Sequence, residues 1–263
     1  MPDDSVQDHA HTAEATVRTT STPVPELDII VPAYNEAARI GATLDALCGT
    51  LSRTGTRARV LVVDNASVDD TVDQVVRSRG SHLIPIEVVN CRAQGKGAAV
   101  RAGIRRADAP FVAYLDADQS TPPQALITGL MLLKHGWDAV IGSRRALGGV
   151  YLVPQAPLRR AGSRAFNLAA SRIVGQVSDT QCGLKMFRTE AIKPVFAASQ
   201  IDGFAFDVEL LARARDAGLR VMELPVSWTD SPGSTFSPVR DGLTAFRELS
   251  RVRRVLRSEV APA

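Results

Sequence analysis

The chain has 263 residues, of which 45% are hydrophobic and 22% charged, and its formal net charge is only +3. This length allows one large domain or two small ones with a substantial core, and the small net charge gives no reason to expect a nucleic-acid partner. Three cysteines, Cys48, Cys91 and Cys182, stand far apart in the sequence. Their spacing indicates a reducing compartment and no structural metal cluster.

The N-terminal segment is polar and has no apolar stretch of the kind found in signal peptides, so we expect residues 1–25 to be a disordered tail. No apolar run reaches the roughly 18 residues that span a bilayer. We therefore expect a cytoplasmic protein, with the inner face of the membrane as the alternative location.

Short apolar runs alternate with helical patterns from residue 27 to residue 145. Strands are predicted at 27–31 (stopped by Pro32), 60–63, 84–89, 111–115 and 139–142. Helices are predicted through 40–47, at 71–79, from Gly95-Lys96-Gly97 onward, and at 124–135. This alternation predicts an α/β fold with a doubly wound, mostly parallel sheet. No GxGxxG or GxxxxGK[ST] motif is present, which disfavours a Rossmann dinucleotide fold and a P-loop NTPase.

Polar residues follow each of these predicted strands. They are Asn35-Glu36, Asp64-Asn65, Asn90, Asp116 with Asp118, and Ser143-Arg144. The carboxyl ends of parallel strands meet at one edge of a sheet, where open α/β sheets bind their ligands. The sequence therefore predicts a site for a nucleotide-type ligand at that edge.

The segment 111–123, FVAYLDADQSTPP, is the most informative part of the chain. Asp116 and Asp118 bracket Ala117, and in extended backbone both carboxylates would point to the same side. Two adjacent carboxylates repel each other, so a divalent cation between them is expected, and hard oxygen ligands suit Mg²⁺ or Mn²⁺. The alternative interpretation is an acidic turn at the end of a strand.

The pattern changes after Arg145. A loop at 146–157 is followed by a predicted helix at 158–174, a turn-like segment at 179–183 and a short strand at 184–187. Residues 203–207 then lead into a helix that runs through 217–218. A strand at 221–228, broken by Pro225, and a basic helix from about Pro238 complete the prediction. The basic helix and the 146–157 loop could make peripheral contact with a membrane, or form a solvated charged surface. Trp137 and Trp228 are expected in the core rather than at a binding site.

Taken in order, these segments resemble the inverting, family-2 glycosyltransferases with a GT-A fold, most of all the dolichyl- and polyprenyl-phosphate sugar synthases of the dolichyl-phosphate β-glucosyltransferase-like branch. The matching segments are 31–36, 63–67, 95–97, 116–118, 120–122, 141–144, 179–183, 202–209 and 232–234. The resemblance runs from about residue 27 to residue 257. It implies a single GT-A domain at 26–257, with a nucleotide-sugar half at 26–145 and an acceptor half at 146–257.

The resemblance also implies a donor site for a nucleotide sugar, with UDP-glucose favoured and GDP-mannose as the alternative. The donor-binding residues it implies are Pro32, Ala33, Tyr34, Glu36, Asp64, Lys96 and Asp116. Asp118 is the implied metal ligand, and Gln119, where the branch usually has Leu, is a second candidate ligand. Two alternatives remain open: Asp64 could cap a helix through a turn, and Lys96 could be a solvated lysine.

For the acceptor, the resemblance implies a polyprenyl phosphate bound by Arg144, Arg159 and Ser163. Guanidinium groups bind phosphate bidentately, and Arg159 and Ser163 are four residues apart on one helical face. The alternative is a merely solvated basic helix. The sequence departs from the branch at Thr235, where a basic residue is usual.

The acceptor decides whether a catalytic base is needed. A lipid phosphate is already anionic and requires none, whereas a hydroxyl acceptor requires a base, for which Asp207 and Asp179 are the candidates. Each could instead be structural. Three functions stay open: a polyprenyl-phosphate glycosyltransferase, a soluble glycosyltransferase that uses a hydroxyl on a small molecule or sugar, and a non-catalytic nucleotide-sugar-binding protein.

Overall fold

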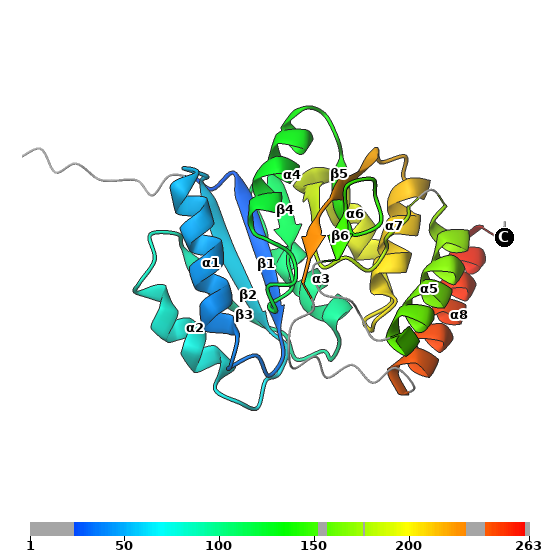
Figure 1. Ribbon diagram of the computed structural model, residues 1–263, viewed down its shortest axis with the longest axis horizontal. Helices are drawn as coiled ribbons and strands as arrows, with labels where there is room; N and C mark the ends of the chain where they lie inside the picture. The colour runs from blue at the N-terminus through cyan, green and yellow to red at the C-terminus, as the bar shows by residue number, and fades with distance from the viewer. Residues whose placement is uncertain (1–23, 152–156, 176, 230–239, 261–263) are drawn as a thin grey trace, which may run out of the picture.

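The computed structural model describes residues 24–151, 157–175, 177–229 and 240–260 (Figure 1). For residues 150–151, 157–161, 240–243 and 259–260 it describes the backbone alone. The predicted tail therefore lies outside the described residues, apart from its last two positions. Within the described ranges a seven-stranded sheet lies between layers of helices.

The sheet confirms the predicted α/β class. Its strands are β1 (Leu27–Ala33), β2 (Ala58–Asp64), β3 (Ile86–Asn90), β4 (Phe111–Tyr114), β5 (Ala139–Ser143), β7 (Lys185–Arg188) and β8 (Val221–Pro225). Their order is β3-β2-β1-β4-β7-β5-β8, and all pairs are parallel except those of β7, which is antiparallel to β4 and β5. A separate parallel pair joins β6 (Val150–Tyr151) to β9 (Ser227–Trp228).

Helices cover both faces of the sheet. They are α1 (Ile40–Arg53), α2 (Thr71–Arg79), α3 (Lys96–Arg106), α4 (Gln124–Lys134), α5 (Pro157–Val174), α6 (Thr189–Ala198), α7 (Phe206–Asp216) and α8 (Arg240–Val260). Alternate residues of β1 show the two cores: Ile29 packs in the cluster with α1 and α4, and Ile30 in the cluster with α3, α6 and α7. Strands covered on both faces are apolar throughout, which is why the strand segments are so hydrophobic.

Two features of the fold differ from the sequence-based expectation. Strand β1 continues through Pro32, which was expected to stop it. Strand β4 pairs with β1 only as far as Ile30, so Pro32 faces a partner strand on one side alone and its missing N–H costs little. Helix α6 was not predicted, although Ile192, Val195 and Phe196 form a buried stripe, because Pro194 within it reads as a helix breaker.

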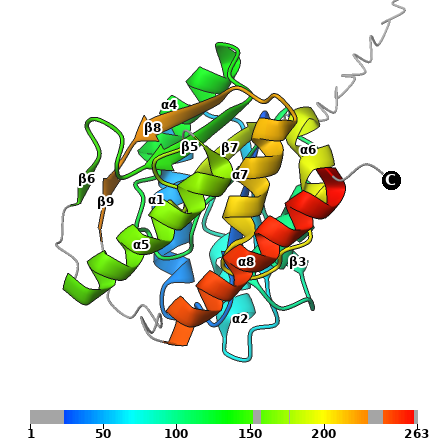
Figure 2. The same cartoon turned by 90° about the vertical axis from the view of Figure 1, so that its right-hand side faces the viewer.

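Helices α5 and α8 lie side by side on the outside of the molecule, and α7 lies between them and the sheet (Figure 2). They pack through a shared apolar cluster that includes Phe166, Ile173, Leu249 and Val252. No helix within the described residues is long and apolar enough to cross a membrane.

Candidate active site

The candidate site residues come together where the parallel strands end. Strands β1, β2, β4 and β5 finish at the same edge of the sheet, and antiparallel β7 begins there (Figure 1). Helices α3 and α7 also begin at this edge, with Lys96 as the first residue of α3 and Asp207 in the first turn of α7. This arrangement brings Glu36, Asp64 and Asp116 of the predicted donor site to one side of the molecule.

Asp116 and Lys96 form an ion pair at the centre of this edge, with 2.5 Å between Lys96 Nζ and Asp116 Oδ1. Burial acts to raise the pKa of Asp116, but Lys96, Lys185 and Arg144 outweigh it and hold the pKa below its usual value. Gly183 faces this carboxylate so closely that a Cβ there would collide with Asp116 Oδ2. Asp116 is therefore a fixed carboxylate that is ionised at neutral pH.

The expected extended Asp-Ala-Asp arrangement is wrong. Strand β4 ends at Tyr114, and Asp118 lies in a turn, where its Oδ1 accepts a 2.9 Å hydrogen bond from the Ser120 N–H. Gln119 follows in a left-handed conformation with a φ of 58°. The turn was the alternative interpretation of this segment.

Acidic charge still accumulates around Asp118. Burial raises the pKa of Glu36, and the negative charges of Asp118 and Asp116 add to that rise, against the lowering effect of Arg39. Within the described part of the chain no group of three His, Cys, Asp or Glu side chains could hold a metal ion by itself. The carboxylates of Asp118 and Asp116 fit a cation such as Mg²⁺. Proteins commonly hold Mg²⁺ with one or two carboxylates, and substrate phosphates complete its coordination.

The turn after β1 is held by the turn after β2. The backbone N–H groups of Asn35 and Glu36 donate to Ser67 Oγ and Thr71 Oγ1 at 3.0 and 2.8 Å. Asn35 adopts a left-handed conformation with a φ of 55°, which turns the chain at this point. Tyr34, one of the predicted donor-binding residues, is 59% exposed at this turn.

The two predicted donor carboxylates of this region both have protein partners. Glu36 accepts hydrogen bonds from Arg39 Nε and Nη2 at 2.7 and 2.9 Å. Buried Asp64 accepts a 3.2 Å hydrogen bond from the Ser67 N–H in a local turn, which lies before α2 and does not cap that helix. That turn involves one oxygen of Asp64, and a carboxylate has lone pairs on both oxygens.

The Gly-Lys-Gly segment is shaped by its contacts with the loop before α7. Gly95 has a φ of 117°, and a Cβ there would collide with the Asp202 carbonyl oxygen. The Gly97 N–H donates to that oxygen at 2.8 Å, and Asn65 Oδ1 accepts from the Gly95 N–H at 2.9 Å. These contacts place Lys96 toward Asp116, so Lys96 is not the solvated lysine of the alternative interpretation.

A buried ion pair that sequence reasoning missed lies beneath Asp116. Lys185 Nζ lies 2.8 Å from Asp207 Oδ1 and 2.8 Å from the Cys182 carbonyl oxygen, and the Tyr114 hydroxyl donates to the same Asp207 oxygen. The Lys185 side chain is 0% exposed and that of Asp207 4%. A lysine in the otherwise apolar predicted strand 184–187 was the only sequence signal for this pair.

The second candidate base, Asp179, is held by Arg144. Arg144 Nε and Nη2 donate to the two carboxylate oxygens at 2.7 and 2.8 Å, and the Arg144 N–H adds a third bond at 3.0 Å. Burial acts to raise the pKa of Asp179, but Arg144 outweighs it and the pKa is lowered. The Trp228 ring lies 5.3 Å from the guanidinium carbon of Arg144 and is buried, as expected for a core residue.

The predicted acceptor cluster is only partly described. Arg144 is at the edge of the site and bound to Asp179, and Ser163 is half-buried on α5. The backbone of Arg159 is part of α5, but the structure does not describe its side chain. The grouping of these three residues around a phosphate stays a prediction.

Comparison with known sequences shows the family to which the chain belongs. Residues 28–196 match the model of glycosyl transferase family 2. This match covers more than half of the chain, so the chain belongs to glycosyl transferase family 2 and is a glycosyltransferase.

Curated relatives are similar over most of the chain. The dolichyl-phosphate beta-glucosyltransferase of Drosophila melanogaster is 32% identical over 244 residues, which are 87% of this chain and 74% of that protein. The dolichyl-phosphate hexose transferase of Haloferax volcanii is 30% identical over 230 residues, which are 86% of this chain and 93% of that protein.

A solved structure supports the fold. Glucosyl-3-phosphoglycerate synthase from Mycobacterium tuberculosis, crystallised with Mn²⁺, UDP-glucose and phosphoglyceric acid, superimposes with a TM-score of 0.66 at 19% identity, covering 87% of this chain and 78% of that one. The GT-A fold predicted from the sequence is confirmed. At this identity the similarity establishes the fold alone.

Proposed function

We propose that this glycosyltransferase moves glucose from UDP-glucose to a polyprenyl phosphate, with inversion at the anomeric carbon. The names of its curated relatives support both the sugar and the lipid-phosphate acceptor. The structural neighbour that was crystallised with UDP-glucose supports the same donor for this fold. GDP-mannose is the alternative donor.

The state of the two candidate bases is the observation that favours a phosphate acceptor. Asp179 is bound to Arg144 through both oxygens, and Asp207 is buried against Lys185 and Tyr114. Arg144 holds the pKa of Asp179 below its usual value, which makes this carboxylate a weak proton acceptor. Asp207 Oδ1 is already engaged by the Lys185 ammonium and the Tyr114 hydroxyl. A phosphate acceptor is anionic at neutral pH and needs no such base, whereas a hydroxyl acceptor does.

In the proposed reaction the chain positions the donor and balances its charge. Tyr34, Glu36 and Asp64 would contact the uridine, together with Pro32 and Ala33. Asp116 would orient the sugar, and Lys96 holds Asp116 in place through their ion pair. Asp118, with Gln119 beside it, would hold Mg²⁺ or Mn²⁺, which when bound neutralises the diphosphate leaving group. An acceptor phosphate oxygen attacks the anomeric carbon from the face opposite the diphosphate, the bond to UDP breaks, and UDP leaves with the electron pair.

In this proposal the acceptor enters from the side of α5, whose residues Arg159 and Ser163 would bind its phosphate together with Arg144. A lipid acceptor requires the enzyme to work at a membrane surface. We therefore propose peripheral contact with the cytoplasmic face of a membrane.

The test is a transfer assay with purified protein, Mn²⁺ and each of two donors, UDP-glucose and GDP-mannose, offered to polyprenyl phosphate or to the matched alcohol polyprenol. The proposal predicts glucosylated polyprenyl phosphate and UDP, no product from polyprenol, and loss of transfer in Asp118→Asn. Transfer to polyprenol, or to a soluble hydroxyl acceptor in its place, would contradict the acceptor assignment. Absence of UDP release with every acceptor would favour a binding protein without turnover.

A further inference from the structure

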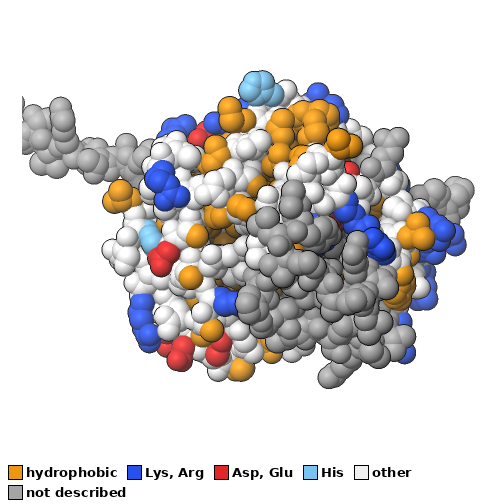
Figure 3. Space-filling model, viewed as in Figure 1, with side chains coloured by type: hydrophobic (Ala, Val, Ile, Leu, Met, Phe, Trp, Pro, Cys, Tyr) orange, Lys and Arg blue, Asp and Glu red, His pale blue; other side chains and the backbone are white. Residues whose placement is uncertain are grey.

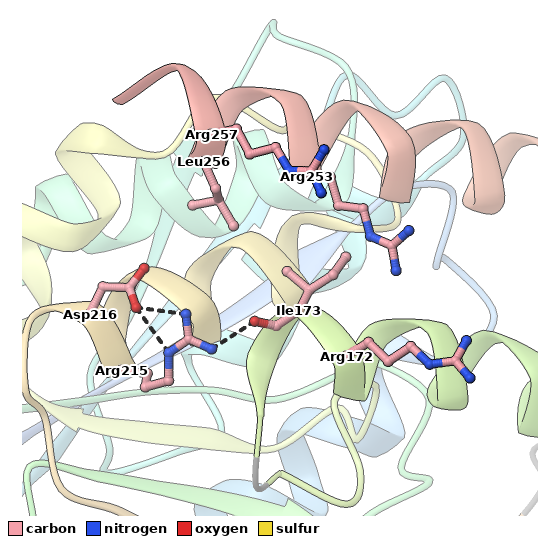
Figure 4. A pocket seen from close by; sticks show the side chains of 7 residues that line it. All are labelled: Arg172, Ile173, Arg215, Asp216, Arg253, Leu256 and Arg257. Atoms are coloured by element: carbon pink, nitrogen blue, oxygen red, sulfur yellow. Dashed lines mark hydrogen bonds and ion pairs between the residues drawn. The ribbon is translucent and has the colours of Figure 1, made fainter. Parts of the chain in front are cut away.

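A basic pocket lies at the end of the molecule away from the candidate active site. It has a volume of about 510 Å³ and is lined by the C-terminal parts of α5, α7 and α8 (Figure 4). The lining residues are Arg172, Ile173, Arg215, Asp216, Arg253, Leu256 and Arg257. The four arginines face one acidic side chain, so the pocket has a strong excess of positive charge.

One of the four arginines is already neutralised. Arg215 Nε and Nη2 donate to Asp216 Oδ1 at 2.9 and 2.6 Å, and its Nη1 donates to the Ile173 carbonyl oxygen at 2.8 Å (Figure 4). Arg172, Arg253 and Arg257 have no hydrogen bond or ion pair within the described parts of the chain. Three guanidinium groups from two helices thus line one cavity, and none of them is paired with a carboxylate of the described residues.

The surface around the pocket has the same character. Exposed arginines continue along the outer sides of α5 and α8, and they are Arg164, Arg172, Arg247, Arg251, Arg253, Arg254 and Arg257. Blue side chains mark this right-hand edge of the molecule in Figure 3. Glu248 of α8 is directed toward the loop before α7, where its Oε2 accepts a 2.8 Å hydrogen bond from the Ala205 N–H.

Apolar groups lie among these charges. Leu168 of α5 is 59% exposed and Phe246 of α8 is 41% exposed, while Ile173 and Leu256 form the apolar part of the pocket lining. Arginines that alternate with exposed apolar side chains on a helical face are typical of surfaces that lie in the interface of an anionic membrane. A soluble phosphate compound would use the charges but not the apolar groups.

We propose that this pocket binds the phosphate headgroup of an anionic phospholipid and that the α5–α8 face docks on the membrane. Guanidinium forks match phosphate geometry, and the apolar side chains would reach the boundary of the acyl chains. Helix α5 has 18 residues and so extends about 27 Å. It could therefore lie along a membrane with the pocket at one end and the active-site edge at the other. The inference builds on the proposed lipid acceptor, but its test does not use sugar transfer.

The test measures sedimentation of the full chain with vesicles of phosphatidylcholine alone and vesicles that also contain phosphatidylglycerol, both free of polyprenyl phosphate. One basic residue near an anionic surface contributes roughly a fivefold change in affinity, so Arg253→Gln with Arg257→Gln should weaken binding to the anionic vesicles about thirtyfold. The matched control is Arg77→Gln with Arg79→Gln, two exposed arginines in the last turn of α2 on the far side of the molecule. This pair should leave vesicle binding unchanged.

A second control separates the pocket from general surface charge. Arg251→Gln with Arg254→Gln removes the same charge from exposed positions of α8 that do not line the pocket, and it should weaken binding clearly less than the pocket pair. Equal losses for the two α8 pairs, or native binding by the pocket pair, would overturn the proposed site. So would binding of soluble glycerol phosphate at the pocket without any binding to anionic vesicles.

Discussion

The buried pair of Lys185 and Asp207 leads to a sharp prediction about stability. Replacing Lys185 by Met removes the cation that lies 2.8 Å from Asp207 Oδ1 and leaves that carboxylate, 4% exposed, with the Tyr114 hydroxyl as its neighbour. Removing one partner of a buried ion pair typically costs about 3–5 kcal/mol, because the remaining charge is desolvated without compensation. For a chain of this size that corresponds to a fall in Tm of roughly 6–20 °C.

The control is an exposed pair of the same kind. Lys134 Nζ lies 2.6 Å from Glu26 Oε2, with side-chain exposures of 45% and 20%. Because solvent screens such pairs, Lys134→Met should cost about 0–1 kcal/mol. Thermal and urea unfolding of both variants give the comparison, and equal costs for Lys185→Met and Lys134→Met would refute the reasoning.

The double variant Lys185→Met with Asp207→Asn tests the same pair for catalysis. Asparagine keeps an acceptor for the Tyr114 hydroxyl and no charge remains buried, so most of the lost stability should return. A general base typically contributes about 10²–10⁴-fold in rate. If Asp207 is structural, the refolded double variant should keep kcat for lipid-phosphate transfer within about tenfold of the native protein; a loss in the range of a missing base would show that Asp207 acts on the acceptor.

Three further predictions concern the edge of the sheet. Asp118→Asn should abolish the Mn²⁺-dependent rise in Tm that UDP-glucose produces, as chelation of the metal should in the native protein, measured by thermal shift. Asp179 has a lowered folded-state pKa, so its stabilising effect is present above the unfolded value of about 3.9 and is lost as pH falls below it; acid unfolding of Asp179→Asn should depend less on pH in that window. Gly183→Ala should lower kcat/KM at least about tenfold by displacing Asp116, whereas Gly162→Ala, with open space around it in α5, should leave activity unchanged.

The class of fold was predictable because it depends on local patterns. Apolar runs ended by polar residues gave the strands of the parallel half, and α2 begins and ends at the predicted residues. The antiparallel placement of β7 between β4 and β5 could not be predicted, because strand pairing depends on the whole chain rather than on the segment 184–187. Helix α6 was hidden by Pro194, which packing tolerates near the middle of a helix.

The sequence predicted which residues lie at the candidate site better than it predicted which side chains they bind. Asp116 and Lys96 were both named as donor residues, yet only the fold shows that they form an ion pair across 20 residues of sequence. Asp118 was expected in extended backbone and lies in a turn, since the strand stops at Tyr114. Lys185 was missed because a lysine in an apolar strand has no recognisable pattern until its buried partner is known.

The ion pairs at this edge of the sheet suggest why a nucleotide-sugar donor would bind here together with a divalent cation. Three cationic side chains are each matched to one carboxylate: Lys96 to Asp116, Lys185 to Asp207 and Arg144 to Asp179. Within each pair the two charges cancel. Asp118 adds a negative charge, which contributes to the raised pKa of Glu36. The diphosphate of a nucleotide sugar is itself doubly anionic, so it would enter a neutral or acidic edge rather than a basic one. A divalent cation held by Asp118 would neutralise the diphosphate, so that Lys96 and Arg144 could stay with the carboxylates that they hold in place.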